Sequence, residues 1–580
     1  MNDHDEQNIQ QEINMSRILK KIITFAFPIL IGLPSYAFAY TMPVGIPNTT
    51  IDFEQKAPDR PSNWTSEVPG YYYIDTVNGA SSGTYGSESK PIKSLPRTIP
   101  AGSYIEIAGE LKISSGYVVK VNGTNETWVA NSSGPIWITT SEVNKGTIIG
   151  GRLILTGSNV FITDLNFKEG GKPQVGSPTA GYDIENIVIR NNDINGSNIP
   201  GSGISINRVT NAIIYNNKIH DFGDINATTD EDAHIMSVGT SSNNIWILSN
   251  KQHTASGSGL QIIGDSDTTS NIFVGNNEIY NVRQSGLWLK GGKNIIFSSN
   301  HVHNIIDTPW SVSKGMGAQY APNNFWMINN HIEDAEYGIR IASTNSTEYT
   351  KKIYTIGNII NNITEKSGIG YVGTVNSWQS AGIHLAGGEE HYIYNNLIFD
   401  APNGVITSSY NHKVFIKNNI IFDLNENHEN GSRGYSIWSE GNKGSDKLLI
   451  ENNFFNSEMN VKLNHTIYET APLLSVDGYL KNLIGEIEIT DTDIDSITST
   501  LLTTPTLSDS LKDSGTNINN IIITAYKEAF PNSEGVNLDF LNNPRSLGNS
   551  IDIGPLEQDG IKPEYIIPNK PSNINLNILD

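Results

Sequence analysis

The sequence predicts an all-β solenoid, a parallel β-helix of about a dozen coils with a C-terminal segment that packs back onto it. Two short strand patterns alternate from about residue 184 to residue 455, one opening with glycine and one built on asparagine. The stretch from Gly257 to Ala342 shows both patterns, in GSGLQI, NIFVGNNEIY, QSGLWLK and NIIFSSNHVH. We expect each pair of patterns to form one turn, since such repeats with short apolar alternations are typical of solenoids.

The N-terminal residues 1–39 are predicted to be a secretory signal peptide, and we expect its true start at Met15. Three basic residues follow Met15, an apolar core runs from 22 to 33, and Ala37-Phe38-Ala39 forms a small-x-small cleavage site. The core is short and is interrupted by two prolines, so an uncleaved membrane anchor is the less favoured alternative. We therefore expect a secreted, periplasmic or cell-surface bacterial protein without stable membrane insertion.

The rest of the chain divides into three predicted parts. Residues 40–70 contain prolines and no strand pattern, and we interpret them as an irregular segment. Residues 71–480 carry the strand patterns and are predicted to form the β-helix. Residues 481–580 are predicted to be the C-terminal closing segment.

One asparagine recurs in each repeat, at intervals from 23 residues (277 to 300) to 38 residues (358 to 396). Asparagine tolerates bent turn geometry, and its amide can bond to the same residue in the coils above and below. We therefore predict a structural ladder, without a catalytic role, formed by Asn192, Asn217, Asn250, Asn277, Asn300, Asn330, Asn358, Asn396, Asn419 and Asn453.

The asparagine-based strands also carry an apolar column. In Asn211 to Asn217 the second and fourth residues should point inward and the third outward. An uncovered apolar stripe along the whole coil would be a docking or aggregation liability. We expect the C-terminal region or long loops to cover it, with a sugar-stacking surface as the alternative. Its members are Val188, Ile213, Trp246, Phe273, Ile296, Trp326, Tyr354, Tyr392, Phe415 and Leu449.

The strands that open with glycine present a polar strip instead. From Gly286 to Lys290, Leu287 and Leu289 should point inward, while Trp288 should point outward. Such a strip, walled by inserted loops, is where a long polymer would lie on a β-helix. Alignment of the glycines predicts that the Trp288 column contains Ser205, Gln261, Trp288, Gln319, Arg340 and His384.

The composition limits the possible partners. The chain has 580 residues, 60 acidic and 38 basic, and a net charge of -22, which argues against nucleic-acid binding. An acidic polysaccharide remains possible where a local basic cleft exists. The absence of cysteine excludes disulfides and thiolate metal sites. We expect a monomer.

Cationic and aromatic residues gather around the polar strip. We expect Lys290 and Arg340, two coils apart, to lie roughly 10 Å from each other. This set suits β-elimination of a uronate polymer, which needs a cation for the carboxylate, a base for the C5 proton and an acid for the leaving oxygen. We assign the cation to Arg340, the base to Lys290 or Lys314, and the acid to Tyr320. Substrate-binding residues are predicted to be Gln261, Trp288, Trp310, Lys314, Gln319 and His384.

Two further clusters are candidate sites of other kinds. The carboxylates of Asp230, Glu231 and Asp232, next to His234, could bind Ca²⁺ or serve as the acid pair of a glycosidase, although a solvated acidic loop is favoured. Five histidines recur after the coil asparagines, and we interpret most of them as turn residues. Two of them, with Asp307, form a weak metal possibility. The five are His220, His253, His301, His303 and His331.

Over roughly residues 70–560 the chain resembles right-handed parallel β-helix proteins of the pectate-lyase-like superfamily. The resemblance rests on the coil patterns, the opening coil with Gly83-Thr84 and Lys90-Pro91-Ile92, and the closing motifs from Asn537 to Gly554. It implies a polysaccharide lyase or glycoside hydrolase that acts on uronate polymers, and some such lyases use a Lys base, an Arg and Ca²⁺. Here Lys290 and Arg340 are not on adjacent coils, and the paired-aspartate and Gly-His-Gly motifs of polygalacturonase-like hydrolases are absent from the sequence.

The favoured function is therefore a secreted lyase that cleaves an acidic polysaccharide, with Ca²⁺ as a candidate cofactor. A β-helix glycoside hydrolase and a non-catalytic glycan-binding or adhesin-type surface protein are the alternatives. Fold analogy alone does not choose among them.

Overall fold

A computed structural model describes most of the predicted β-helix and one C-terminal helix. Nearly all described residues belong to the unit Met42–Asp580. The predicted signal peptide, the pair Gly83-Thr84 and the closing motifs from Asn537 to Gly554 lie outside the described residues. The described residues are 40–58, 71–81, 86–94, 98–99, 101–113, 120–121, 135–177, 184–264, 268–308, 310–320, 322–342, 351–364, 380–408, 411–421, 424, 434–439, 447–451, 453–455, 461–463 and 520–531.

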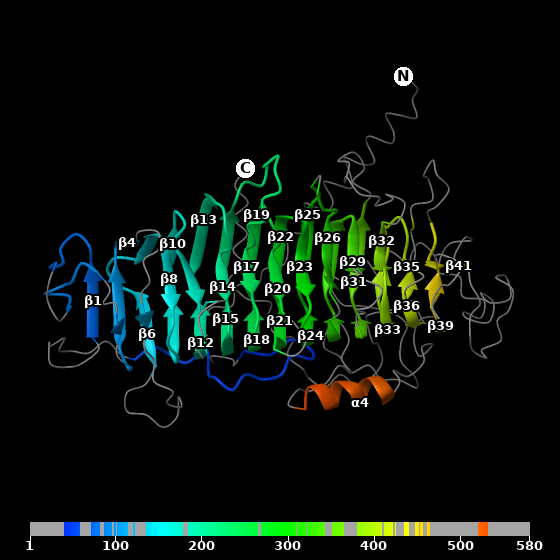
Figure 1. The fold of residues 1–580 in the computed structure, drawn as a ribbon, viewed down its shortest axis with the longest axis horizontal. Helices are drawn as coiled ribbons and strands as arrows, with labels where there is room; N and C mark the ends of the chain where they lie inside the picture. The colour runs from blue at the N-terminus through cyan, green and yellow to red at the C-terminus, as the bar shows by residue number, and fades with distance from the viewer. Residues whose placement is uncertain are drawn as a thin grey trace, which may run out of the picture. The chain divides into compact units, whose positions relative to one another are not determined.

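The strands form three long parallel sheets, in which β1 pairs with β3 and every later neighbour is three places away in the chain (Figure 1). Sheet 1 contains β1 (Tyr71–Asp75), β3 (Tyr104–Ala108), β6 (Ile136–Thr140), β9 (Val160–Thr163), β12 (Ile184–Arg190), β15 (Val209–Tyr215), β18 (Asn243–Leu248), β21 (Ser270–Gly275), β24 (Lys293–Ser298), β27 (Asn323–Ile328), β30 (Lys352–Ile356), β33 (Gly388–Tyr394), β36 (Asn411–Lys417) and β39 (Lys447–Glu451).

Sheet 2 contains β4 (Glu110–Ile113), β7 (Thr147–Gly150), β10 (Asn166–Lys168), β13 (Asp193–Ile199), β16 (Lys218–Phe222), β19 (Lys251–Ala255), β22 (Glu278–Arg283), β25 (His301–Ile306), β28 (His331–Ala335), β31 (Ile359–Ile363), β34 (Leu397–Ile398), β37 (Ile420–Ile421) and β40 (Phe454–Phe455). Sheet 3 contains β8 (Arg152–Leu155), β11 (Lys172–Val175), β14 (Ile204–Ile206), β17 (Met236–Val238), β20 (Leu260–Ile263), β23 (Ser285–Lys290), β26 (Lys314–Gln319), β29 (Tyr337–Ile341), β32 (Ala381–Leu385), β35 (Val405–Thr407), β38 (Ile437–Ser439) and β41 (Val461–Leu463). The short strands β2 (Thr98–Ile99) and β5 (Lys120–Val121) pair separately, and the described helix is α4 (Asn520–Ala529).

The predicted right-handed parallel β-helix of about a dozen coils is thus confirmed, but each full coil has three strands where the sequence suggested two. The missed strand belongs to sheet 2. In β25, Val302 and Ile305 are fully buried three residues apart, because Asn304 between them has a left-handed backbone (φ 51°). The bend breaks the two-residue alternation by which strands are recognised. All five recurring histidines lie in strands of sheet 2, namely β16, β19, β25 and β28, so the interpretation of most of them as turn residues is wrong.

The predicted asparagine ladder is confirmed at every described step. The backbone N and Nδ2 of Asn300 donate to Oδ1 of Asn330 at 3.0 and 2.9 Å, and Nδ2 also donates to the Val274 carbonyl at 3.0 Å. In many coils the residue before the ladder asparagine has a left-handed backbone, as Ser299 has (φ 56°). This conformation turns the chain from sheet 1 into sheet 2. The ladder therefore supplies hydrogen bonds where the corner leaves backbone groups without sheet partners.

The predicted apolar column of sheet 1 is also confirmed in register, and its members are buried from Val188 to Tyr354 and half-buried from Tyr392 to Leu449. Residues 42–58 and α4 lie along its outer side (Figure 1). Trp246 Nε1 donates to the Pro47 carbonyl at 2.9 Å, and the Trp326 ring meets that of Tyr526 edge-on at 5.0 Å. Since Trp246 is 4% exposed and Trp326 is fully buried, this part of the column does not form a sugar-stacking surface.

Candidate active site

The polar strip lies on the outer face of sheet 3, and its register differs from the predicted one at one position. Gly317, not Gln319, stands between Trp288 and Arg340, while Gln319 pairs with Lys290. The strand KGMGAQ has glycines two residues apart, and both alignments keep the same residues pointing inward, so the pattern alone favoured the wrong one. The observed column is Gln174, Ser205, Ser237, Gln261, Trp288, Gly317, Arg340, His384, Ile406 and Trp438.

A pocket lies beside Gly317, which stands between Trp288 and Arg340 in the column. A Cβ atom at Gly317 would lie 1.8 Å from the Arg340 carbonyl oxygen and 3.0 Å from the Trp288 ring. The pocket has a volume of about 180 Å³ and brings together five residues that the sequence predicted for the site. Its lining is Trp288, Trp310, Ser311, Val312, Lys314, Gln319, Arg340 and Ala342.

Lys314 begins β26 and is buried beneath the loop that joins β25 to β26. Its Nζ atom donates to Ser311 Oγ at 2.6 Å and to the Val312 carbonyl at 2.8 Å, and lies 5.1 Å from the Trp288 ring centre. Burial, followed by the charge of Arg340, lowers the pKa of Lys314 from 10.5 to about 7. A lysine in this state holds a substantial fraction of neutral amine at neutral pH, as a general base requires.

Arg340 and His384 continue the strip beyond the pocket. The Arg340 guanidinium is half-buried and lies over the Tyr337 ring at 4.8 Å, and its Nε has no hydrogen-bond partner among the described residues. His384 is 3% exposed, and burial followed by the charge of Arg340 lowers its pKa to about 3. His384 is therefore neutral at neutral pH, and Arg340 supplies the positive charge.

A buried carboxyl pair lies behind Lys314, and the sequence did not predict it. Burial, followed by the charge of Asp307, raises the pKa of Glu336 to about 8, and a hydrogen bond with Asp307 contributes to this rise. Asp307 also accepts from the backbone N of Ser313. The sequence could have pointed to Glu336. The two preceding coils have Gln284 and Ser313 at this corner position, so a carboxyl group there is unusual. At neutral pH Glu336 is mainly protonated and adds little negative charge beside Lys314.

The other two predicted catalytic residues do not line this pocket. Lys290 is half-buried at the end of β23, beside Gln319. Tyr320 directly follows β26, is 47% exposed and has a left-handed backbone (φ 60°). Gln261 lies one coil before Trp288, is 5% exposed and hydrogen-bonds to His234. The roles proposed for these residues remain predictions.

The acidic cluster does not assemble a set of converging ligands. Asp232 accepts a hydrogen bond from Gln284 Nε2 at 2.8 Å, Glu231 accepts one from the Asp224 backbone at 3.4 Å, and Asp230 is exposed. In the described part of the chain, each group of three converging donors includes at least one histidine. Calcium prefers oxygen ligands throughout, so these groups do not fit it, and its involvement stays a prediction.

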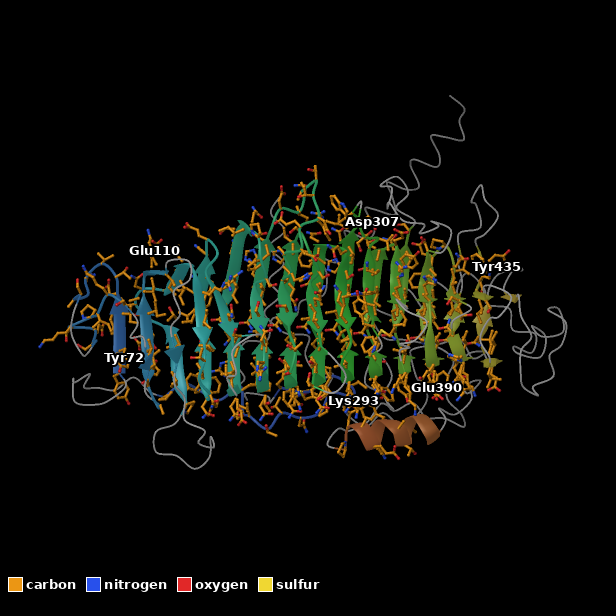
Figure 2. All side chains as sticks on the ribbon, viewed as in Figure 1. Tyr72, Glu110, Lys293, Asp307, Glu390 and Tyr435 are labelled. Atoms are coloured by element: carbon orange, nitrogen blue, oxygen red, sulfur yellow. The ribbon has the colours of Figure 1, made fainter. Side chains whose placement is uncertain are left out.

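The histidines form stacked rows on sheet 2. The rings of His220, His253, Tyr280 and His303 follow one another at 4.8, 4.8 and 4.9 Å. His301 and His303 converge with Glu278 and not with Asp307, because Glu278 occupies the His301 column in the neighbouring coil. Figure 2 shows Asp307 at the upper edge of the coils and Lys293 at the lower edge.

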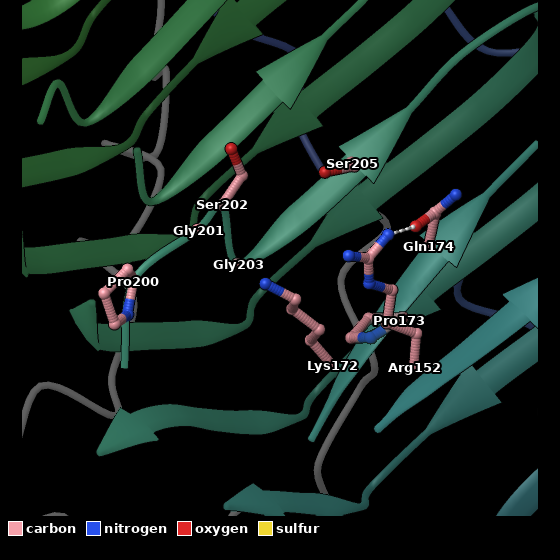
Figure 3. Close-up of a pocket in the computed structure, with 9 residues that line it drawn as sticks. All are labelled: Arg152, Lys172, Pro173, Gln174, Pro200, Gly201, Ser202, Gly203 and Ser205. Atoms are coloured by element: carbon pink, nitrogen blue, oxygen red, sulfur yellow. Dashed lines mark hydrogen bonds between the residues drawn. The ribbon is translucent and has the colours of Figure 1, made fainter. Parts of the chain in front are cut away.

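A second pocket lies on sheet 3, several coils before the first. It has a volume of about 150 Å³, and Lys172 and Arg152 point into it (Figure 3). Arg152 Nη1 donates to Gln174 Oε1 at 3.1 Å. The sequence contains a signal for this pocket, because two successive coils place a cation at the same outward position of paired strands, Arg152 in β8 and Lys172 in β11. The full lining is Arg152, Lys172, Pro173, Gln174, Pro200, Gly201, Ser202, Gly203 and Ser205.

No protein-family model and no curated protein matches the chain. Among solved structures, a periplasmic alginate epimerase (AlgG) is similar over 65% of this chain and 79% of its own, with 11% identity and a TM-score of 0.32. The A-module of the Azotobacter vinelandii mannuronan C-5 epimerase AlgE4 covers 64% and 89%, with 14% identity and a TM-score of 0.29. The Streptococcus pneumoniae surface adhesin PfbA covers 56% and 83%, with 13% identity and a TM-score of 0.40.

Similarity at this level concerns the fold and does not carry function. The sheets themselves establish the architecture, with 14, 13 and 12 parallel strands in the described chain. Among the described residues, no helix is long and apolar enough to cross a membrane. The resemblance inferred from the sequence holds at the level of the fold, and the chain is a right-handed parallel β-helix protein.

Proposed function

We propose that the chain is an exported carbohydrate-active enzyme that removes the C5 proton of a uronate residue and cleaves an acidic polysaccharide by β-elimination. The observation that supports this most directly is the pairing of Lys314 and Arg340 in one aromatic-walled pocket. The first offers an amine with a pKa of about 7, and the second offers a fixed cation.

Arg340 binds the substrate carboxylate in this proposal. Its half-buried guanidinium presents donors in a fork that matches carboxylate geometry. Neutralising the carboxylate stabilises the negative charge that develops when the neighbouring C5 proton leaves. Trp288 and Trp310 form apolar walls against which sugar rings can stack.

Lys314 acts as the base, replacing Lys290 as the preferred candidate because it lines the pocket and is buried. The neutral amine takes the C5 proton, and the neighbouring carboxylate takes up the C–H electron pair as an enolate. This pair then forms the C4–C5 double bond as the C4–O bond breaks, and the leaving oxygen takes a proton from an acid. Tyr320 keeps this predicted role, since the side chain follows the pocket-lining Gln319 directly in the chain.

The hydrolase alternative is not favoured by the carboxyl groups near the pocket. A hydrogen bond between Asp307 and Glu336 contributes to the raised pKa of Glu336, so the two carboxyl groups lie close together. Glycosidases keep their two carboxyl groups about 5 Å or more apart, to leave room for the scissile bond or a water molecule. The pair is better suited to regulating the protonation of Lys314. The adhesin-type alternative predicts glycan binding without any product.

The test is an ultraviolet absorbance assay for unsaturated products, with alginate, pectate and glycosaminoglycans, each with and without Ca²⁺. We expect an absorbance rise that is lost in Lys314→Met and Arg340→Ala but kept in Lys293→Met, an exposed lysine on sheet 1. A rise that survives Lys314→Met but not Lys290→Ala would move the base to Lys290.

A parallel reaction in D₂O separates proton removal from elimination. Deuterium at C5 without unsaturated product would retain the proposed proton abstraction and replace cleavage by epimerisation. New reducing ends without absorbance would mean hydrolysis. Binding with no chemical change in any polymer would identify a glycan-binding protein and overturn the proposed function.

A further inference from the structure

The pocket that contains Lys172 and Arg152 has the features of an anion site without an anion from the protein. In the described part of the chain, neither side chain forms an ion pair, although the protein carries a net charge of -22. Lys172 is half-buried, and burial followed by the charge of Arg152 lowers its pKa to about 8. Two cations that face the same space repel each other, and burial also disfavours the charged form of Lys172. An anion bound between the two cations would offset both the repulsion and the cost of burial.

The walls of this pocket provide space and neutral hydrogen-bonding groups. A Cβ atom at Gly201 would lie 3.1 Å from Lys172 Nζ, and the backbone there is left-handed (φ 107°), so glycine keeps the ammonium accessible. Ser202 and Ser205 also line the pocket, as Figure 3 shows. A compact carboxylate with two acceptor oxygens fits this combination of two cations and two hydroxyl groups.

The pocket is aligned with the candidate active site. Ser205 in its wall belongs to the same outward column as Trp288 and Arg340. The strand order from β11 through β14, β17, β20 and β23 to β26 contains five steps, so the two lysines, Lys172 and Lys314, are separated by about 24 Å along the coil axis. A sugar residue advances an extended polymer by about 5 Å, close to one coil step, so roughly five residues would span the two pockets.

We infer that Lys172 and Arg152 form a distal subsite that binds a carboxylate of the same acidic polysaccharide, about five sugar residues from the bond at Lys314. The inference rests on the proposed function, because it takes the same polymer as ligand. It deepens that function by making the protein selective for long chains: an oligomer too short to reach both pockets gains nothing from the distal one.

The test measures binding of alginate and pectate oligomers of about three and about ten residues by titration calorimetry. The parent protein is Lys314→Met, which prevents turnover. In this background we expect the double change Lys172→Ala and Arg152→Ala to weaken binding of the ten-residue oligomer about 10- to 100-fold, as expected for two lost charge-assisted contacts. Binding of the three-residue oligomer should be unchanged.

Two matched variants complete the design. Lys172→Arg keeps the charge and should retain long-oligomer binding, while Lys168→Ala removes an exposed lysine from sheet 2 and should have no effect. Equal loss for both oligomers, or no loss for either, would overturn the distal subsite while leaving the proposed function in place. If the Lys314→Met parent binds neither oligomer of either polymer, the proposed function and the subsite both fail for these substrates.

Discussion

Replacing Lys314 by methionine should make the protein more stable while it removes the proposed activity. The substitution keeps an unbranched side chain of similar volume and deletes the amine. Lys314 is 7% exposed, and its surroundings disfavour the ammonium form. A lysine that destabilises the fold is better explained by chemistry than by structure.

The magnitude follows from the pKa of Lys314 and from the contacts of its Nζ atom. The pKa falls from 10.5 to about 7, and at about 1.4 kcal/mol per pKa unit the buried amine costs up to about 5 kcal/mol. The variant loses the two hydrogen bonds of Nζ and the contact of the ammonium with the Trp288 ring. These losses reduce the gain in stability by about 2–3 kcal/mol. We therefore expect the free energy of unfolding to rise by about 1–3 kcal/mol at neutral pH.

The pH dependence of this effect has a defined sign. Because the pKa of Lys314 is lower in the folded state, only the unfolded chain binds the proton fully between about pH 7 and 10.5. The penalty on the native protein is complete below about pH 7 and disappears as the pH approaches 10.5. The advantage of Lys314→Met should therefore be largest at or below about pH 7 and should shrink by about pH 10.

Urea unfolding followed by tryptophan fluorescence, at about pH 6, 7 and 10, measures both effects. Lys293→Met is the matched control, because Lys293 is exposed at the opposite edge of the coils from Asp307 (Figure 2), and its unfolding should be unchanged. A loss of more than about 1 kcal/mol at pH 7 in Lys314→Met would refute the reasoning. Lys314 would then be a structural residue that anchors the β25–β26 loop.

Three other changes test the scaffold and the site. Asn300→Leu removes four ladder hydrogen bonds made by its side chain and should lower the free energy of unfolding by about 3–5 kcal/mol in urea titrations; a loss as small as that of Asn226→Ala, at an exposed loop position, would contradict the ladder's role. Gly317→Ala places a Cβ 1.8 Å from the Arg340 carbonyl oxygen, so it should lower the free energy of unfolding by about 1–3 kcal/mol and displace Arg340 enough to abolish turnover; unchanged turnover would mean that the position of Arg340 is not critical. Glu336→Gln should retain most activity at pH 7, since burial raises the pKa of Glu336 to about 8; a loss above tenfold would make this carboxyl a proton donor or acceptor.

The repeat made most of the fold predictable from the sequence. The Asn300 and Trp326 columns recur once per coil, so each member reinforced the alignment of the others. The strands of sheet 2 were missed because their left-handed residue, such as Asn304, places inward side chains three residues apart. A periodicity of two cannot reveal a strand that bends at its centre.

The site was predictable where strand alternation decides which side chains point outward, apart from the two-residue shift that exchanged Gln319 for Gly317, and it was unpredictable at the corners. Trp288 and Arg340 follow from strand alternation alone. The pairing of Asp307 with Glu336 does not, because the two residues come from different coils and meet only when the β25–β26 loop folds over the corner. The same loop buries Lys314 and lowers its pKa, which is why the sequence could not choose between Lys314 and Lys290.

An acidic protein that binds an acidic polymer should show an unusual response to salt. The net charge of -22 repels the polymer at long range, whereas the two cationic pockets attract it only at contact. Salt screens charges separated by more than about 8–10 Å far more than partly buried contacts. Association rates measured by stopped-flow fluorescence should therefore rise when ionic strength increases from about 0.02 to 0.15 M, in contrast to the fall typical of basic clefts. If the rate falls steeply instead, the cationic strip dominates the long-range field, and binding does not depend on the two pockets as separate short-range sites.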